Sequence, residues 1–240
     1  FETARGCWWG AKQHCTFCGL NNNGMAFRAK SPAEAIRQLQ SLASRYQIVN
    51  FEAVDNIMDY KYIDSLCSPL AERRYDYRIF YEVKANLSRA HLQNMARAGV
   101  TSIQPGIESL SSHILELMRK GITMLRNVRL LKWAYYYGIR ASWNVLTGFP
   151  GETAEDYEEQ LRVISLIRHL PPPSACVPVW LERFSPYFFD SSFPVRNVRP
   201  LKVYSHIYPE TLDVSAIAYF FEYEMDNVLP DETHDELRLQ

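Results

Sequence analysis

The chain has 240 residues, of which 47% are hydrophobic and 13% aromatic, enough for one large domain with a substantial core. Its formal net charge of -1 argues against the basic face that nucleic-acid binding requires, so we expect no nucleic-acid partner. No apolar run reaches the roughly 20 residues that span a bilayer, and we therefore expect no membrane span.

Helix-like and strand-like segments alternate from residue 30 to residue 188. We predict strands at 2–7, 47–54, 77–83, 101–107, 140–148 and 175–184, separated by helices that begin after Ser31 and at 62–73, 88–99, 111–137 (with a break near Gly121) and 153–169. Strands separated by helices pair in parallel through right-handed crossovers. Six such units favour an open doubly wound sheet or a partial barrel, and in both folds ligands gather at the carboxyl ends of the strands.

The pattern loosens after residue 190. Residues 195–210 are typical of a loop, and residues 214–225 fit a helix or a strand. We therefore divide the chain into a core, residues 1–190, and a C-terminal extension, residues 191–240. The first residues, "FETARGC", begin in what resembles the middle of a strand, so we expect the chain to be a piece of a longer protein.

Five cysteines, three of them crowded into twelve residues, indicate a reducing compartment such as the cytoplasm rather than a secreted disulfide framework. Cys7, Cys15 and Cys18 have the spacing C-x7-C-x2-C and follow the first predicted strand. Three thiolates on one loop can hold three irons of a [4Fe–4S] cluster. The fourth iron then keeps an open coordination position, where a cofactor or substrate can bind the metal directly.

Three other interpretations of this cysteine loop stay open at this point, and the simplest is that the spacing is fortuitous and the cysteines are core residues. A structural zinc site would use the three cysteines with His14 as the fourth ligand. Alternatively, Cys15 and Cys18 form a redox-active C-x2-C pair. Cys67 and Cys176 stand apart from the loop, and we expect both to be small buried apolar residues.

The cysteine loop, its place after the first strand and the β/α series together resemble the radical S-adenosylmethionine (SAM) superfamily. In that family three cysteines carry a [4Fe–4S] cluster, and the amino and carboxylate groups of SAM chelate its unique iron. The spacing departs from the family's common C-x3-C-x2-C, because seven residues separate the first two cysteines here. Three other segments are similar to family motifs: "NFEAVDN" (50–56), "GVTSIQPGIESLS" (99–111) and "NVLTGFPGET" (144–153).

The long first gap, with "CWWG" and "CTFCGLN" at its two ends, resembles one subgroup in particular. These are the cobalamin-dependent C-methylases of peptide (RiPP) maturation and their carbapenem-tailoring relatives. The resemblance implies an α/β fold, a partial (β/α)6 TIM-like barrel of the radical SAM type, over about residues 1–188. The "DxHxxG" sequence of a cobalamin-binding domain is missing from the 240 residues, so we expect that domain upstream, outside this stretch.

The resemblance also implies roles for single residues. Cys7, Cys15 and Cys18 would ligate the cluster. The residues that would bind SAM are Phe17, Glu82, Lys84, Gln104, Glu108, Ser109 and Asn144.

These SAM-binding assignments have alternatives. Phe17 matches an aromatic residue whose backbone meets the adenine, or it covers the apolar floor under the loop. Lys84 is a point charge for the SAM carboxylate that shares a strand face with Glu82, or both lie at a solvated strand end. Glu108 accepts hydrogen bonds from the SAM amine or ribose, or it is a first-turn acid of a helix. Asn144 faces the ribose, or it is a satisfied core amide.

Two further segments lie near the expected site. Residues 148–153 combine a turn with a helix start, in which Thr153 caps a helix beginning at Ala154, and we interpret the segment as mainly structural. Trp8 and Trp9, beside the cluster loop, are the aromatic residues best placed to line a cavity.

The reaction implied by the resemblance is one-electron cleavage of SAM to methionine and a 5′-deoxyadenosyl radical, which removes a hydrogen atom from an unactivated carbon. The favoured function is cobalamin-dependent methylation of that carbon in a peptide or small natural product, as in antibiotic biosynthesis. The expected cofactors are a [4Fe–4S] cluster, SAM and cobalamin, and the expected electron donor is a flavodoxin or ferredoxin. A methylthiotransferase-like radical SAM enzyme without cobalamin and a zinc-stapled, non-catalytic binding module are the alternatives.

Overall fold

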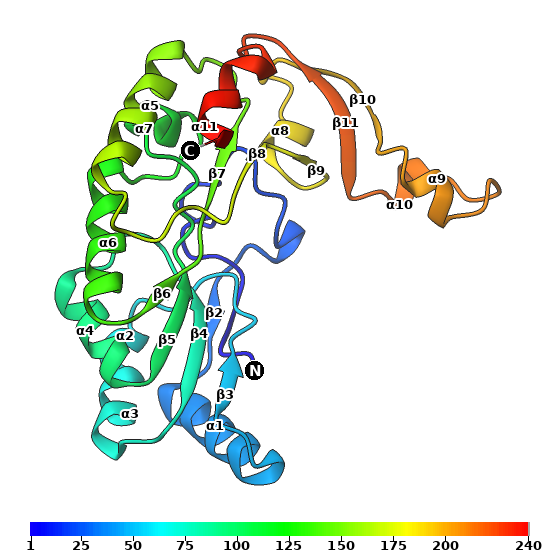
Figure 1. Cartoon of the computed structure of the whole chain (residues 1–240). Coiled ribbons are helices and arrows are strands. Elements are labelled where there is room, and N and C mark those ends of the chain that lie inside the picture. The colour runs from blue at the N-terminus through cyan, green and yellow to red at the C-terminus, as the bar shows by residue number, and fades with distance from the viewer. Residues whose placement is uncertain (240) are drawn as a thin grey trace.

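The computed structural model describes residues 1–239, and its centre is a curved parallel sheet (Figure 1). Four strands lie in the order β3 (Asn50–Glu52), β4 (Arg78–Glu82), β5 (Val100–Gln104) and β6 (Arg140–Ala141). β7 (Asn144–Thr147) and β8 (Ala175–Pro178) form a second parallel pair. A bridge between Glu108 and Val145 joins this pair to the first sheet.

The N-terminal segment adds a further strand position at the β3 edge. The Phe1 ammonium group donates to the Glu52 carbonyl at 2.8 Å, and the Phe1 carbonyl accepts from the Val54 amide at 2.9 Å, which is the parallel pattern. β1 (Ala4–Arg5) then pairs antiparallel with β2 (Arg28–Ala29). With β6 and β7 counted as one interrupted strand, the chain forms a partial (β/α)6 barrel, and the expected fold class is confirmed.

Helices cover one side of the sheet, as Figure 1 shows for α4 to α7. Their bounds are α1 (Pro32–Tyr46), α2 (Tyr62–Ser65), α3 (Cys67–Arg73), α4 (Arg89–Arg97), α5 (Ser112–Leu117), α6 (Met124–Tyr136) and α7 (Ala154–Leu166). In β4 the side chains of Ile79 and Tyr81 are buried against this layer, whereas Arg78, Phe80 and Glu82 alternate to the other face. The polar face of the sheet therefore lines the inside of the barrel. Within residues 1–239, the helices all fall short of the length and apolarity that crossing a bilayer requires.

Several predicted elements are interrupted. The helix expected at 62–73 divides at Leu66 into α2 and α3, and the Leu66 backbone keeps a right-handed helical conformation with φ of -108°. The strand expected at 140–148 breaks at Ser142–Trp143, where the buried indole of Trp143 donates to the Pro171 carbonyl. The strand expected at 175–184 ends at Pro178, because proline has no N–H for the ladder. The break predicted near Gly121 is confirmed between α5 and α6.

The C-terminal region forms an antiparallel sheet in the order β10–β11–β9. Its elements are β9 (Leu181–Glu182), α8 (Pro186–Phe189), β10 (Val195–Pro200), α9 (Tyr204–Ile207), α10 (Val214–Ile217) and β11 (Phe220–Met225). The loop expected at 195–210 was therefore wrong over β10, whose backbone pairs with β11 although its side chains are largely exposed. Residues 214–225 contain both a helix and a strand. β10 and β11 extend away from the barrel as an arm (Figure 1).

Two single-turn 3-10 helices and a last helix complete the structure. The first lies at Asn22–Gly24 in the loop after the cysteines, and the second at Asp231–His234 leads into α11 (Asp235–Leu239). α11 returns from the arm and packs beside α7 and β8 (Figure 1). The end of the described chain thus lies against the barrel.

A buried carboxylate joins the starts of α5 and α7. The Asp156 side chain accepts from the amide and hydroxyl of Thr153 at the start of α7, which matches the helix start predicted there. It also accepts from the Ser111 hydroxyl at 2.6 Å and contacts His113 Nδ1 at 2.9 Å. Burial raises the pKa of Asp156, but these hydrogen bonds lower it by more, so its pKa lies below the ordinary value of 3.8.

We expect Asp156→Asn to lower the free energy of unfolding by about 1–3 kcal/mol at pH 7, because an uncharged amide replaces a buried acceptor with several donors. Since the folded pKa of Asp156 is lowered, the stabilisation that its carboxylate provides is present above pH 4 and is lost as the pH falls through that folded pKa. The difference between variant and wild type should therefore shrink below pH 4 in denaturant titrations. Glu155→Gln, one residue away and exposed, makes the same charge change and should have little effect.

Candidate functional site

A cavity of about 180 Å3 lies where β4 and β5 end. Its walls come from the cysteine loop, from the ends of β3, β4 and β5 and from the turn after α5. Nine of the residues singled out in the sequence line it: Cys7, Trp9, Cys15, Phe17, Cys18, Glu82, Lys84, Gln104 and Glu108. The carboxyl ends of the parallel strands thus bring together residues that lie up to a hundred positions apart.

Backbone contacts hold the cysteine loop against the barrel. Gly6 has a φ of +78°, and a Cβ there would lie 2.5 Å from the Ala26 carbonyl oxygen, so only glycine fits before Cys7. The Cys7 amide then donates to the Met25 carbonyl at 3.2 Å, and the Thr16 amide donates to the Met118 carbonyl at 3.1 Å. These contacts fix the loop at both ends, with its three thiols on the same cavity.

Burial is the main influence on the pKa values of two of the three thiols. It raises the pKa of Cys18 to about 12, and it raises the pKa of Cys15 as well, against the lowering effect of Lys120 and Lys84. Without a metal these thiols are therefore protonated. Binding to iron requires the thiolates, and the two lysine ammonium groups are the cations that would offset their charge.

The arrangement differs from that of a single-ion site. Across residues 1–239, no three or more His, Cys, Asp or Glu side chains converge to chelate one metal ion. His14, the fourth ligand of the zinc alternative, has its Nε2 2.7 Å from the Cys18 carbonyl oxygen. A cubane cluster takes one thiolate at each of three irons, and the three cysteines of the loop line one cavity.

Lys84 lies across the face of Trp9. Its Nζ is 3.7 Å from the ring centroid, and it donates to the Lys120 carbonyl. Burial, followed by the positive charge of Lys120, lowers the pKa of Lys84 to about 8. Trp9 itself is anchored by its indole N–H, which donates to the Arg119 carbonyl at 3.1 Å. The lysine is therefore held at the cavity wall rather than at a solvated strand end.

Lys120 and Glu108 form an ion pair inside the cavity. Lys120 Nζ lies 3.3 Å from Glu108 Oε1, and the two side chains are only 13% and 18% exposed. Burial lowers the pKa of Lys120, but the charges of Glu108 and Cys15 raise it by more, so its net shift is upward. Gly106 leaves the space for this lysine, since a Cβ there would lie 3.0 Å from Nζ. Sequence reasoning missed Lys120, because only the fold carries the turn after α5 to the end of β5.

Two neighbouring polar side chains complete the strand-end wall. Glu82 and Gln104 are paired in register on β4 and β5. Burial, followed by the negative charge of Glu108, raises the pKa of Glu82. The cavity therefore holds two lysines and two carboxylates, a set that matches a zwitterionic ligand in its charges.

Three of the sequence candidates lie outside this cavity. Ser109 is fully buried, and its hydroxyl donates to Gln160 Oε1 at 3.0 Å. Asn144 is half-buried at the start of β7 and is not among the lining residues. Trp8 turns away and donates to the Met58 carbonyl at 3.1 Å. Conversely, Asn56 of the "NFEAVDN" segment lines the cavity and donates to Asn21.

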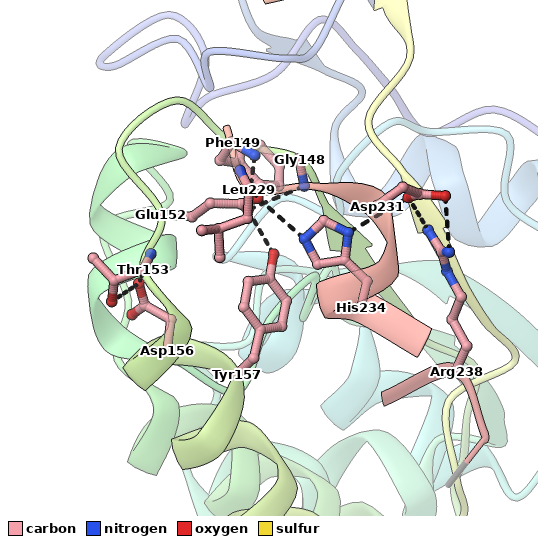
Figure 2. Close-up of polar contacts among 10 residues, drawn as sticks. All are labelled: Gly148, Phe149, Glu152, Thr153, Asp156, Tyr157, Leu229, Asp231, His234 and Arg238. Atoms are coloured by element: carbon pink, nitrogen blue, oxygen red, sulfur yellow. Dashed lines mark hydrogen bonds and ion pairs between the residues drawn. The ribbon is translucent and has the colours of Figure 1, made fainter. Parts of the chain in front are cut away.

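The turn at 148–153 is built around a carboxylate that the sequence did not single out. The Glu152 side chain is fully buried and accepts from the amides of Gly148 and Phe149 at 3.0 and 2.9 Å (Figure 2). The Tyr157 hydroxyl donates to the same oxygen at 2.5 Å, and His234 Nε2 lies 3.1 Å from the other one. Burial raises the pKa of Glu152, and these hydrogen bonds lower it by more.

Strand β9, which pairs with β11 of the arm, also contacts the cysteine loop. The amide of Gly19, next to Cys18, donates to Glu182 Oε2 at 2.6 Å, and the hydroxyl of Tyr219 donates to the same oxygen at 3.3 Å. Glu182 belongs to β9 and Tyr219 immediately precedes β11. Residues on both sides of position 190 therefore support the cysteine loop.

Comparison with known proteins was made by sequence and by structure. Residues 1–164 match the model of the Radical SAM superfamily. A curated relative, an uncharacterized methyltransferase of Pyrococcus horikoshii, is 27% identical over 164 residues, which are 67% of this chain and 35% of the relative. The ribosomal protein uS12 methylthiotransferase RimO of Chlorobium limicola is 24% identical over 191 residues, 75% of this chain and 44% of RimO. The chain thus spans less than half of the length of these relatives.

Solved structures give the same fold. The radical SAM methyltransferase TsrM of Kitasatospora setae, solved with cobalamin and a [4Fe–4S] cluster, has a TM-score of 0.65 at 18% identity over 79% of this chain and 38% of TsrM. The cobalamin-dependent SAM radical enzyme OxsB has a TM-score of 0.58 at 21% identity over 68% of this chain and 26% of OxsB. Because the family model covers most of the chain and the fold agrees, this protein belongs to the radical SAM superfamily.

Proposed function

We propose that the chain is the catalytic core of a cobalamin-dependent radical SAM C-methyltransferase, acting on an unactivated carbon of a peptide or a carbapenem-like small molecule. The observation that carries the proposal is the convergence of three thiols, two lysines and two carboxylates on one strand-end cavity. The TsrM and OxsB folds support the subgroup.

The donor set of the cavity fits an iron–sulfur cluster. Cys7, Cys15 and Cys18 offer three soft sulfur ligands, which select iron–sulfur clusters over hard cations such as Mg2+. The two lysine ammonium groups offset the negative charge that the thiolates would bring into a buried site. We assign the three cysteines as ligands of a [4Fe–4S] cluster.

The charges around the same cavity match those of SAM, which carries a carboxylate and an amine beside its adenine. Lys120 and Lys84 would hold the carboxylate, and Glu82, Glu108 and Gln104 would accept hydrogen bonds from the amine and ribose. Phe17 would form the wall beside the adenine. Ser109 and Asn144 would support the lining residues and not contact SAM themselves, since neither lines the cavity.

When bound, these cofactors supply the one-electron cleavage of SAM to methionine and a 5′-deoxyadenosyl radical and, with cobalamin, the transfer of a methyl group. The role of the chain's own residues would be to bind and orient these cofactors. The Lys120–Glu108 pair is preformed, so little reorganisation is needed when a charged ligand enters. Trp9 and Phe17 restrict water at the cavity, which strengthens these electrostatic contacts.

Other parts of the proposal concern the parent protein. Cobalamin would be bound mainly by a domain outside this stretch, and a flavodoxin or ferredoxin would donate the electron. We propose a cytoplasmic location and neither a nucleic-acid nor a membrane partner.

A second function has its own support. RimO and a tRNA-2-methylthio-N(6)-dimethylallyladenosine synthase of Sulfurihydrogenibium, 39% identical over 66 residues, are relatives of this chain. A methylthiotransferase without cobalamin is therefore the alternative. The zinc-containing module is the third candidate, but the contact of His14 with the Cys18 carbonyl disfavours it.

Anaerobic reconstitution of the intact protein with iron, sulfide, cobalamin and SAM, with dithionite as the one-electron reductant, tests the function. The expected result is about four irons per chain, bound cobalamin, and 5′-deoxyadenosine detected by mass spectrometry. 5′-Deoxyadenosine without cobalamin binding would favour the methylthiotransferase. One zinc per chain and no 5′-deoxyadenosine would contradict both functions.

We expect Cys15→Ala to abolish cluster assembly, because two thiolates cannot retain the cubane. Iron and acid-labile sulfide analysis after reconstitution measures this outcome. Cys176→Ala is the matched control, since Cys176 lies on β8 outside the cavity and should leave both contents unchanged. Equal iron in the Cys15 and Cys176 variants would contradict the assignment.

We expect Lys120→Met to weaken SAM binding roughly 10- to 100-fold, because the variant loses the buried cation and leaves Glu108 unpaired. Equilibrium dialysis of the reconstituted protein against labelled SAM gives the Kd. Lys132→Met on the exposed face of α6 removes the same charge and should leave the Kd unchanged. A Lys120 variant that binds SAM like the wild type would show that this lysine does not contact the ligand.

A further inference from the structure

The segment 227–238 closes over the turn at 148–152 (Figure 2). The Gly151 amide donates to the Asn227 carbonyl at 2.7 Å. The Leu229 amide donates to Glu152 Oε1 at 3.3 Å, and His234 Nε2 lies 3.1 Å from the same oxygen. Three contacts thus join a turn after β7 to residues about eighty positions further along the chain.

His234 belongs to a fully buried arrangement. Its side chain is 2% exposed and that of Glu152 is not exposed at all. A carboxylate in such surroundings is stable only when donors satisfy both of its oxygens. Here Oε2 accepts from the Gly148 and Phe149 amides and from Tyr157, whereas Oε1 has only the long bond from Leu229 and the contact with His234.

The turn that Glu152 holds reaches the cofactor cavity through one aromatic contact. Phe149 is completely buried, and its ring centroid lies 6.0 Å from that of Phe17 in an edge-to-face arrangement. Phe17 lines the cavity between the cluster cysteines. The Phe149 amide is one of the two that Glu152 binds, so the carboxylate sets the position of the ring behind Phe17.

We infer that His234 is a positioning residue of the SAM cavity: by donating to Glu152 it fixes the backbone at 148–149, and through Phe149 it fixes Phe17. This inference rests on the proposed SAM site. The C-terminal extension is then an integral part of the proposed cofactor site, although the residues that line the cavity all come from the first 120 positions of the described chain.

The surroundings of His234 allow this role to be separated from general stability. Its ring lies 4.6 Å from that of Tyr157, and its Nδ1 is 3.5 Å from Asp231 Oδ1. Asp231 in turn pairs with Arg238 at 2.5 Å, and the Asp231 side chain is 70% exposed. Removing Arg238 therefore disturbs the same segment at its surface and leaves the contact between His234 and Glu152 in place.

The experiment compares His234→Ala, His234→Gln and Arg238→Ala in the intact protein. Hydrogen exchange of the metal-free protein reports the protection of the Gly148, Phe149 and Gly151 amides. Reconstitution with iron and sulfide, followed by equilibrium dialysis against labelled SAM, reports cluster content and the Kd for SAM.

We expect His234→Ala to keep the wild-type iron and sulfide content, to raise the Kd for SAM roughly tenfold, and to speed exchange at residues 148–151 more than in β4 and β5. The Gln variant retains a donor and should restore most of the affinity, and Arg238→Ala should match the wild type. If the Ala variant does not fold, His234→Asn replaces it, because that shorter amide cannot reach Glu152.

An unchanged Kd in a folded Ala or Asn variant would overturn the inference. So would a uniform increase in exchange across the barrel with no rescue by Gln, since that is the behaviour of a purely structural residue. A wild-type protein that binds no SAM would contradict the proposed function, and the inference with it. Normal SAM binding by the wild type with no change in the variants contradicts the inference alone.

Discussion

The site depends on the burial of charge at one edge of the barrel. Cys15 and Cys18 have raised thiol pKa values because the loop holds them out of water, and Lys84 has a lowered pKa for the same reason. Opposite charges in such a place attract strongly, whereas an unpaired charge is costly. Iron at the three cysteines, with a carboxylate beside the lysines and an amine beside the glutamates, would satisfy the whole set at once.

The need to hold buried charges in fixed positions explains why close packing and hydrogen bonds fix the backbone around the cavity. Gly6 brings the chain against residues 25–26, and Gly106 makes room for Lys120. The loop that carries the thiols has no regular secondary structure of its own, so its shape depends on bonds to α5, to β9 and to α8. A site of this kind is positioned by the scaffold and not by the loop itself.

Contacts from the last third of the chain also hold loops near the cavity in position. Glu182 and Tyr219 support Gly19 beside Cys18, and His234 satisfies Glu152 behind Phe149. In each case a carboxylate, half-buried for Glu182 and buried for Glu152, accepts from the backbone of a loop near the cavity. The arm projects from the barrel, yet the segment that follows it returns to the turn at 148–152.

The sequence by itself determined the order of strands and helices, the fold family and the group of residues at the strand ends. Periodicity and helix caps such as Ser31 and Thr153 are local, so they are readable in one dimension. Only the tertiary structure decided that Lys120 enters the cavity, that Ser109 turns to Gln160, and that β10 is a strand. Their neighbours lie far along the chain, and burial and hydrogen bonding are set by those distant neighbours rather than by local pattern.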